Sequence, residues 1–136
     1  MKKFIFTLFL TLVACGQNQS PQLPTYDYSD VKTHIDWYDS FKQEEDDYLI
    51  YYYSPTCSHC NSIKQEVISY YLSEKEPIYF VNTQLNSRFG PTKDLIGICD
   101  IESFYIFGTP FLIRVMNYRV ADYYPGVSKI LEYINQ

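Results

Sequence analysis

Two cysteines separated by two residues, Cys57 and Cys60, are the residues whose types and spacing could do chemistry. An apolar run precedes them and a helical pattern follows, so we expect both thiols on the first turn of a helix. A helix N-terminus carries unpaired N–H groups and partial positive charge, which favours a thiolate over a thiol. In such motifs the pKa of the first cysteine falls from about 8.5 to about 3.5–7.5. We therefore expect Cys57 to be an exposed nucleophile and Cys60 the resolving thiol behind it.

A strand, a helix and a second strand are predicted around this pair. Residues 48–53 form an apolar and aromatic run too short for a typical helix, which indicates a central strand buried on both faces. The helix that starts at Cys57 should end near Ser73, and residues 78–81 favour the second strand. Two parallel strands joined through a helix form a βαβ unit. The apolar face of this helix is marked by Ile63, Val67, Ile68 and Tyr71.

An earlier helix is predicted from apolar residues at helical spacing, namely Val31, Ile35, Tyr38 and Phe41. It would begin at Ser29 or Asp30, which are plausible N-caps, and continue to about Gln43. We expect His34, with no second ligand near it in the sequence, to be a surface or half-buried histidine.

Residues 82–107 give the weakest pattern. A helix is predicted over about residues 92–101, and Cys99 at its end is expected to be a small buried apolar residue rather than a third redox thiol. The stretch from Asn82 to Gly90 is either a substrate-recognition loop or a tolerated insertion.

A hairpin and a last helix are predicted at the C-terminal end. Residues 111–115 and 118–124 favour two strands joined by a tight turn at Met116-Asn117. Pro125-Gly126 ends the hairpin. Ser128 is the expected cap of a final helix that packs on the sheet.

Residues 1–14 have the pattern of an export signal, in which Lys2 and Lys3 precede an apolar run too short to span a bilayer as a stable helix. The Leu-Val-Ala-Cys run that follows resembles a bacterial lipobox. That resemblance implies that Cys15 is diacylated and anchors the protein to the cell membrane; the alternative is an ordinary signal peptide that contains a cysteine. Residues 15–28 would then be the lipidated cysteine and a flexible tether, and residues 29–136 a single domain.

Composition excludes one class of function. The net charge is −5 at pH 7 and no basic stripe occurs, so binding to nucleic acid is not expected. With Cys15 lipidated, three cysteines remain, which is not a structural disulfide framework. In an oxidising space outside the cytoplasm the Cys57–Cys60 pair would be a disulfide unless a partner reduces it.

Four features resemble the thioredoxin superfamily: the apolar strand that leads into Ser54–Cys60, the helix after it, Gly108-Thr109-Pro110-Phe111, and Pro125-Gly126 before the last helix. The resemblance covers about residues 31–135. It implies an α/β thioredoxin-like three-layer sandwich, with a central mixed sheet of about four strands flanked by helices.

The resemblance also implies a binding site. Pro110 would be a cis proline that faces the cysteines, and a bound chain would pair with the backbone of Thr109-Pro110. Phe107, Phe111 and the Tyr124-Pro125-Gly126 loop, with Gly126 as a substrate-binding residue, would form apolar walls. No cofactor beyond the Cys57–Cys60 disulfide and no metal is expected.

Departures from the family pattern bear on the direction of the reaction. Reductases of the family usually have an aromatic residue before the first cysteine, Gly-Pro between the cysteines and a buried carboxylate on the preceding strand; here Thr56, Ser58-His59 and Tyr51 stand there. A histidine directly before the second cysteine resembles the oxidase and isomerase branches. A cationic His59 would stabilise the Cys57 thiolate and raise the reduction potential well above the about −270 mV of thioredoxin. His59 could instead be only a residue on the helix surface.

These resemblances imply a thiol–disulfide oxidoreductase outside the cytoplasm, with an oxidase or isomerase leaning. It is similar to small exported thioredoxin-like lipoproteins and to bacteriocin-transport-accessory-like proteins of Gram-positive bacteria. Its partners would be exported proteins with thiols or disulfides and a membrane redox partner. The alternatives are a reductase of exported proteins, a protein that binds zinc or copper through Cys57, Cys60 and His59, with or without Cys99, and a surface interaction module that uses its fifteen tyrosines.

Overall fold

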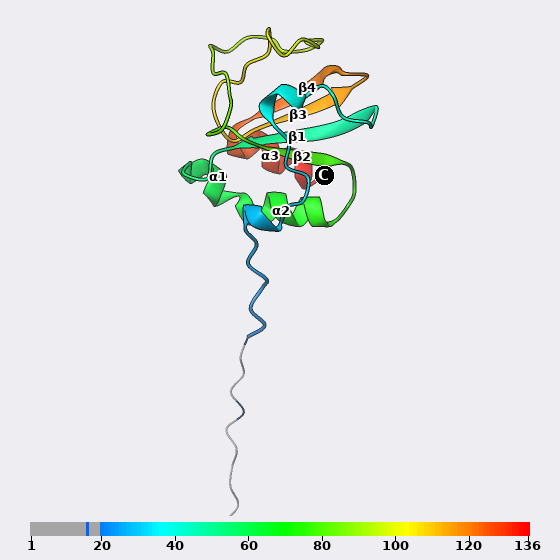
Figure 1. The fold of residues 1–136 in the computed structure, drawn as a ribbon. Helices are drawn as coiled ribbons and strands as arrows, with labels where there is room; N and C mark the ends of the chain where they lie inside the picture. The colour runs from blue at the N-terminus through cyan, green and yellow to red at the C-terminus, as the bar shows by residue number, and fades with distance from the viewer. Residues whose placement is uncertain (1–15, 17–19) are drawn as a thin grey trace, which may run out of the picture.

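The computed structural model describes Gly16 and residues 20–136. The predicted export signal and the predicted lipidation site, Cys15, lie outside the described residues. Residues 20–25 are exposed and extend away from the folded part (Figure 1). Packing begins at Tyr26, whose backbone forms two hydrogen bonds of 2.7 Å with the side chain of Gln65. Among the described residues, no helix combines the length and the apolar character that a membrane span requires.

A four-stranded mixed sheet forms the centre of the fold (Figure 1). Its order is β2-β1-β3-β4, with β1 parallel to β2 and antiparallel to β3, and with β3 antiparallel to β4. The predicted central sheet is therefore confirmed. The strands are β1 (Asp47–Tyr53), β2 (Ile78–Asn82), β3 (Phe111–Met116) and β4 (Arg119–Pro125).

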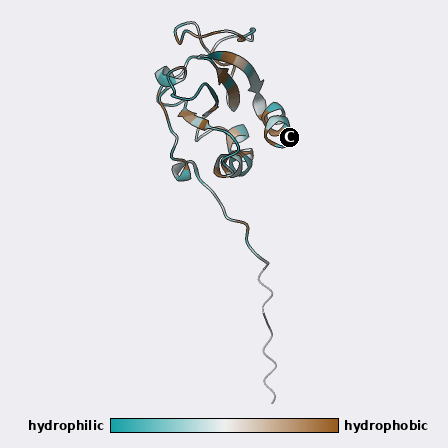
Figure 2. Cartoon of the chain, turned by 90° about the vertical axis from the view of Figure 1, so that its right-hand side faces the viewer, coloured by the Kyte–Doolittle hydropathy of each residue, from teal (hydrophilic) through white to brown (hydrophobic). Residues whose placement is uncertain are grey.

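Strand β1 is buried on both faces, as its continuous apolar run predicts. Side chains alternate along a strand, so Leu49, Tyr51 and Tyr53 face one hydrophobic cluster, while Ile50 and Tyr52 face a second. The first cluster holds the apolar sides of helices α1 (Ser58–Ser62), α2 (Lys64–Leu72) and α3 (Gly126–Ile134). In Figure 2 the brown of hydrophobic residues runs along the strands of the sheet.

The helix predicted from Cys57 to Ser73 is present but interrupted. Ile63, with φ −118° and ψ 9°, separates α1 from α2, and its side chain is buried in the core. Helix α2 ends at Leu72 with Ser73 as its C-cap, which matches the predicted end. The βαβ unit around the cysteines is confirmed, because β2 follows α2 and lies parallel to β1.

The helix predicted over residues 29–43 is wrong. Only two short 3-10 helices form, η1 (Tyr28–Asp30) and η2 (Trp37–Asp39). Between them, Thr33 and Ile35 hydrogen-bond the backbone of Phe80 on the edge of β2. The unpaired edge of β2 thus overrides the helical spacing. His34 lies exposed, as predicted.

The helix predicted over residues 92–101 is also wrong. Asp94 and Asp100 accept hydrogen bonds from the backbone N–H groups of Ile96 and Glu102, which turns the chain locally instead of continuing a helix. Gly97, at φ +84°, interrupts the segment further. Cys99 is exposed rather than buried, since no helix forms to cover it.

Two predicted boundaries at the C-terminal end shift. The hairpin turn lies at Asn117-Tyr118 and not at Met116-Asn117, and both residues have positive φ, as a two-residue hairpin of type I′ requires. Helix α3 begins at Gly126 with Pro125 as its N-cap, so Ser128 lies inside the first turn and is not the cap. No side chain caps this helix.

Candidate active site

The cysteine pair follows directly after the buried strand β1. A four-residue loop, 54–57, leads from Tyr53 to α1, and Cys57 is the N-cap residue of that helix. The N–H of Cys57 donates to the carbonyl of Ser54 across 3.1 Å, which tightens the loop. Cys57 is partly exposed and Cys60 is fully buried, and both are free thiols. The expected arrangement of an accessible first thiol and a buried second one is thus present.

Several hydrogen bonds converge on the Cys57 sulfur. Burial alone would raise its pKa, but hydrogen bonds from the Thr109 hydroxyl and from the backbone N–H groups of Cys60 and His59 more than offset this, so the pKa of Cys57 lies below its ordinary value. The Cys60 N–H lies 3.4 Å from the sulfur. In its protonated form the Cys57 thiol donates to the carbonyl oxygen of Thr109 across 3.5 Å. The thiolate of Cys57 is instead stabilised by the Thr109 hydroxyl and by the N–H groups of Cys60 and His59.

The second thiol has the opposite environment. Burial raises the pKa of Cys60 to about 11, and the neighbouring Cys57 adds to the shift. At neutral pH, Cys57 is the thiol that is more readily ionised, and Cys60 keeps its proton. Two groups with pKa values moved apart can divide one reaction between them.

The loop before β3 faces the cysteines. Its Thr109–Pro110 peptide bond is cis, as expected. The Pro110 carbonyl accepts a hydrogen bond of 3.0 Å from the N–H of Gly126, which joins this loop to the start of α3. Gly126 has φ +79°, a conformation that glycine adopts without strain. The structure therefore brings Thr109, Pro110 and Gly126 to the side of Cys57.

Two adjoining hollows lie along this loop. One, of about 260 Å³, is lined by the exposed His59 together with Thr109, Pro110, Pro125 and Gly126, and reaches Val127 and Ser128. The other, of about 240 Å³, is also lined by Thr109, Pro110, Pro125 and Gly126, and Phe107 and Phe111 form its apolar walls. Of the expected wall residues, Tyr124 lines neither hollow.

The loop after β2 makes one contact with the cysteine loop that the sequence did not predict. The side-chain amide of Gln84 donates to the hydroxyl of Thr56, the residue before Cys57, across 2.8 Å. Leu85 beside it is a large exposed apolar residue. This contact places the start of the 82–90 stretch next to the cysteine loop.

Two tyrosines, Tyr28 and Tyr51, lie behind the cysteine pair. The hydroxyl of Tyr28 donates to the carbonyl of Cys60 across 3.4 Å, and Tyr51 packs in the same buried cluster. For Tyr51 the parity of the strand is a usable signal, since it shares a face with Tyr53 and thus with α1. Tyr28 lies outside the predicted domain, and nothing near it in the sequence points to Cys60.

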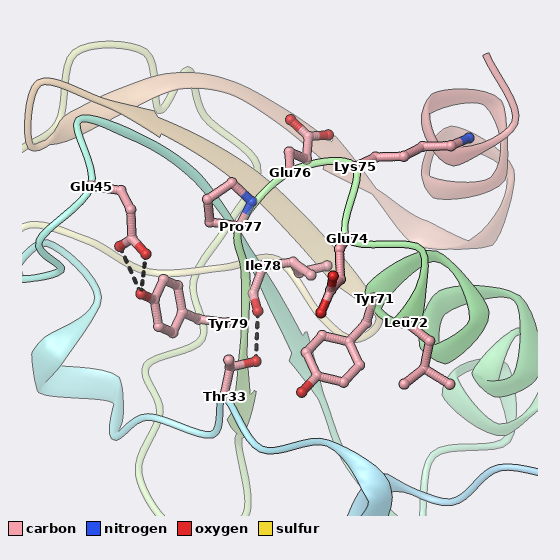
Figure 3. Close-up of a pocket in the computed structure, with 10 residues that line it drawn as sticks. All are labelled: Thr33, Glu45, Tyr71, Leu72, Glu74, Lys75, Glu76, Pro77, Ile78 and Tyr79. Carbon is pink, nitrogen blue, oxygen red and sulfur yellow. Dashed lines mark hydrogen bonds between the residues drawn. The ribbon is translucent and has the colours of Figure 1, made fainter.

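A third hollow, of about 450 Å³, lies at the other end of the sheet (Figure 3). It surrounds the start of β2, where the carboxylate of Glu45 accepts from the Tyr79 hydroxyl and Thr33 bonds the Ile78 carbonyl. Because β1 starts there and ends at the cysteine loop, its seven residues separate the two places by about 20 Å. This hollow is not part of the cysteine site.

The described residues hold no group of three or more His, Cys, Asp or Glu side chains that could bind a metal ion. Cys99 is not a member of the site. Its neighbour Ile98 accepts from the N–H of Val120, near the hairpin turn, whereas the cysteines face the opposite end of β4.

Comparison with known proteins supports the fold. No family model and no curated protein matches this sequence. Mitochondrial thioredoxin 3 from Saccharomyces cerevisiae, in its oxidised form, superposes with a TM-score of 0.53 at 11% identity, over 79% of this chain and 94% of that one. Thioredoxin f2 from Chlamydomonas reinhardtii has a TM-score of 0.48 at 15% identity, over 76% of this chain and 93% of that one. The chain therefore has the thioredoxin-like α/β fold that its motifs predict.

Proposed function

We propose that this protein is a thiol–disulfide oxidoreductase that acts on protein thiols and disulfides through Cys57 and Cys60. The observation that carries the proposal is the difference in exposure and in pKa between the two cysteines. Cys57 is partly exposed with a lowered pKa, and Cys60 is buried directly behind it with a raised one. A low-pKa, accessible thiolate next to a resolving thiol is the arrangement that disulfide exchange requires.

The exchange can run in either direction. As a reductant, the Cys57 thiolate attacks a substrate disulfide, and Cys60 then attacks the Cys57 sulfur and releases the substrate thiol. As an oxidant, the Cys57–Cys60 disulfide is attacked at Cys57 by a substrate thiolate, and a second substrate thiol resolves the mixed disulfide. The order of attack follows from access, because Cys60 is fully buried.

A substrate chain would bind beside the cis Pro110 loop. Thr109 has its carbonyl 3.5 Å from the Cys57 sulfur, so a chain that pairs with this backbone would present its own cysteine to Cys57. The hollows along Phe107, Phe111 and Gly126 would accept the apolar side chains that flank that cysteine.

We also propose that the reaction leans towards oxidation or isomerisation. Factors that stabilise the Cys57 thiolate favour the dithiol form, and a stable dithiol makes its disulfide a stronger oxidant. A protonated His59, exposed beside the hollow, would add to this stabilisation. The enzyme would work outside the cytoplasm, anchored to a bacterial membrane through a lipid on Cys15, and a membrane redox partner would restore its active form.

The reduction potential tests this proposal. The full chain with Cys15→Ser and Cys99→Ser keeps only the two thiols of the site, and equilibration with glutathione buffers followed by thiol quantification gives the potential. We expect a value nearer to about −120 mV than to about −270 mV, the range between a strong oxidase and thioredoxin. A value at or below that of thioredoxin would replace the oxidase leaning with a reductase. Failure of the pair to equilibrate at all would refute disulfide exchange.

A further inference from the structure

Tyr51 is a buried polar residue that the exchange reaction described above does not use. It lies in the middle of β1 with no exposed surface, and its hydroxyl has no hydrogen-bond partner. Among the described residues the only other buried side-chain polar atom without a partner is Nε1 of Trp37, which belongs to the cluster on the opposite face of the sheet. A buried hydroxyl without a partner is costly, so its retention calls for an explanation.

The surroundings of this hydroxyl point to Cys60. Tyr51 shares a buried cluster with Cys60, Tyr28 and Tyr53. The Tyr28 and Tyr53 rings stack with centroids 3.7 Å apart, and the Tyr28 hydroxyl is already used, because it donates to the carbonyl of Cys60. The Tyr53 hydroxyl is paired with Nε2 of His34 across 2.8 Å, whereas the Tyr51 hydroxyl has no such partner and can donate a hydrogen bond.

The tyrosine hydroxyls stay protonated at neutral pH. Burial, followed by the proximity of Tyr28, holds the pKa of Tyr51 far above its usual range, and the charge of a Cys60 thiolate raises it further. Burial likewise raises the pKa of Tyr28. Both groups are therefore hydrogen-bond donors and not bases. Besides Cys60, the other titratable groups around them are Asp27, Tyr53, Cys57 and Lys64.

We propose that Tyr51 is a positioning residue for disulfide exchange: its unpaired hydroxyl donates a hydrogen bond to the Cys60 sulfur whenever that sulfur becomes negatively charged. This inference rests on the proposed function and deepens it. In the resting dithiol the Cys60 sulfur carries a proton and accepts weakly. The strong, charge-assisted bond forms only when Cys60 attacks or leaves as a thiolate. The interaction therefore lowers the barrier rather than stabilising the resting protein.

The step that this hydrogen bond would accelerate is the attack of Cys60 on the mixed disulfide, and it needs no additional base. Cys60 attacks the Cys57 sulfur of the mixed disulfide, so the Cys57–Cys60 bond forms and the bond from Cys57 to the substrate sulfur breaks. The two cysteines are oxidised, the substrate disulfide is reduced, and the proton of Cys60 ends on the departing substrate thiolate. In the reverse direction Cys60 leaves as a thiolate when a substrate thiolate attacks Cys57. In both cases the proposed bond from the Tyr51 hydroxyl would stabilise the same charged sulfur.

A rapid-mixing experiment on the full chain with Cys15→Ser and Cys99→Ser tests this. The reduced protein is mixed with bis(nitrocarboxyphenyl) disulfide, which releases one coloured thionitrobenzoate when Cys57 attacks and a second when Cys60 resolves the mixed disulfide. We expect Tyr51→Phe to leave the first phase within about twofold and to slow the second on the order of ten- to a hundredfold, as loss of a hydrogen bond to a charged group does. The pH midpoint of the second phase should also rise.

Tyr52→Phe is the matched control. It removes a buried hydroxyl from the next residue of the same strand, on the opposite face and away from the cysteines. We expect both of its phases to match the parent. An unchanged second phase in Tyr51→Phe, or equal slowing in both variants, would overturn the inference while leaving the proposed function intact. Absence of the first phase in the parent would instead refute the proposed function.

A second measurement does not depend on turnover. In a Cys15→Ser, Cys57→Ser, Cys99→Ser protein, Cys60 is the only cysteine, and the pH dependence of its carbon-13 labelled Cβ chemical shift reports the ionisation of this thiol. Adding Tyr51→Phe should move that ionisation to higher pH, whereas adding Tyr52→Phe should not. An identical titration in all three proteins would also overturn the role assigned to Tyr51.

Discussion

The backbone N–H of Cys60 points at the sulfur of Cys57 across 3.4 Å. Burial acts to raise the pKa of Cys57, and the hydrogen bond from Thr109, followed by this one from Cys60, lowers it below its usual value. Cys60 thus has two roles. Its backbone stabilises the charge on the first thiol, and its own sulfur is held protonated in the core, with a pKa of about 11.

The first prediction concerns the pH at which the thiols react. In a Cys15→Ser, Cys99→Ser protein, alkylation of Cys57 by iodoacetamide should be half-maximal below pH of about 8.5, the value of an ordinary cysteine, because only the thiolate reacts. Cys60 should stay unmodified at neutral pH because it is buried. Mass spectrometry of the labelled peptides separates the two sites. Half-maximal labelling of Cys57 at or above the ordinary value would contradict the environment described for it.

The second prediction isolates Thr109. Replacement by valine keeps the shape and removes the hydroxyl that helps to lower the pKa of Cys57. The alkylation midpoint of Cys57 should therefore move to higher pH. Thr56→Val is a suitable control, since its hydroxyl is adjacent in the chain but bonds to Gln84. Equal shifts in both variants would show that Thr109 has no specific effect.

The third prediction concerns stability. Tyr51→Phe removes a buried hydroxyl without a partner, so the free energy of unfolding should rise, by about 1 kcal/mol. Tyr52→Phe removes a hydroxyl that bonds to Ser40 Oγ across 2.8 Å and should lower it by about 1 kcal/mol. Urea unfolding of the reduced proteins measures both. A loss of stability in Tyr51→Phe as large as that in Tyr52→Phe would mean that the Tyr51 hydroxyl has a partner in the folded state.

The fourth prediction concerns acid. Arg114 forms two hydrogen bonds, of 2.8 and 2.6 Å, with the carboxylate of Asp47, and these hold the pKa of Asp47 below its usual value. A depressed pKa in the folded state stabilises the protein above the unfolded pKa of about 3.9, and this contribution is lost as the pH falls through the folded pKa.

Arg114→Gln should therefore lose less stability than the parent between pH of about 5 and 2. Both side chains are more than a third exposed, so the difference should not exceed about 1 kcal/mol. Urea unfolding at several pH values measures it. Lys129→Gln, which removes a fully surface-lying pair with Glu132, should leave the pH dependence unchanged. An Arg114→Gln curve parallel to that of the parent would refute the prediction.

Sequence reasoning worked best where the signal is local. Residues 48–53, which form all of β1 except its first position, are apolar or aromatic, and the cysteines follow this run directly, so the strand, the turn and the order of the two thiols could be predicted. The cis peptide before Pro110 could be predicted because a family resemblance marked that position.

The failures occur where distant backbone groups decide the structure. Residues 31–43 have helical spacing, but the edge of β2 offers backbone partners that lie more than forty positions away in the sequence. Cys99 looked like a core residue only as long as a helix was assumed around it. Tyr28 could not be identified, since its bond to Cys60 spans 32 positions.

The same departures from helix have a consequence for self-association. On one edge of the sheet, Thr33 and Ile35 bond to both backbone groups of Phe80, and the Thr33 hydroxyl covers the carbonyl of Ile78. On the other edge, Gly97 and Ile98 bond to both backbone groups of Val120. Unpaired edge strands are templates on which further chains add as strands. The two irregular segments occupy those positions, so they act as protective caps against edge-to-edge aggregation of the sheet.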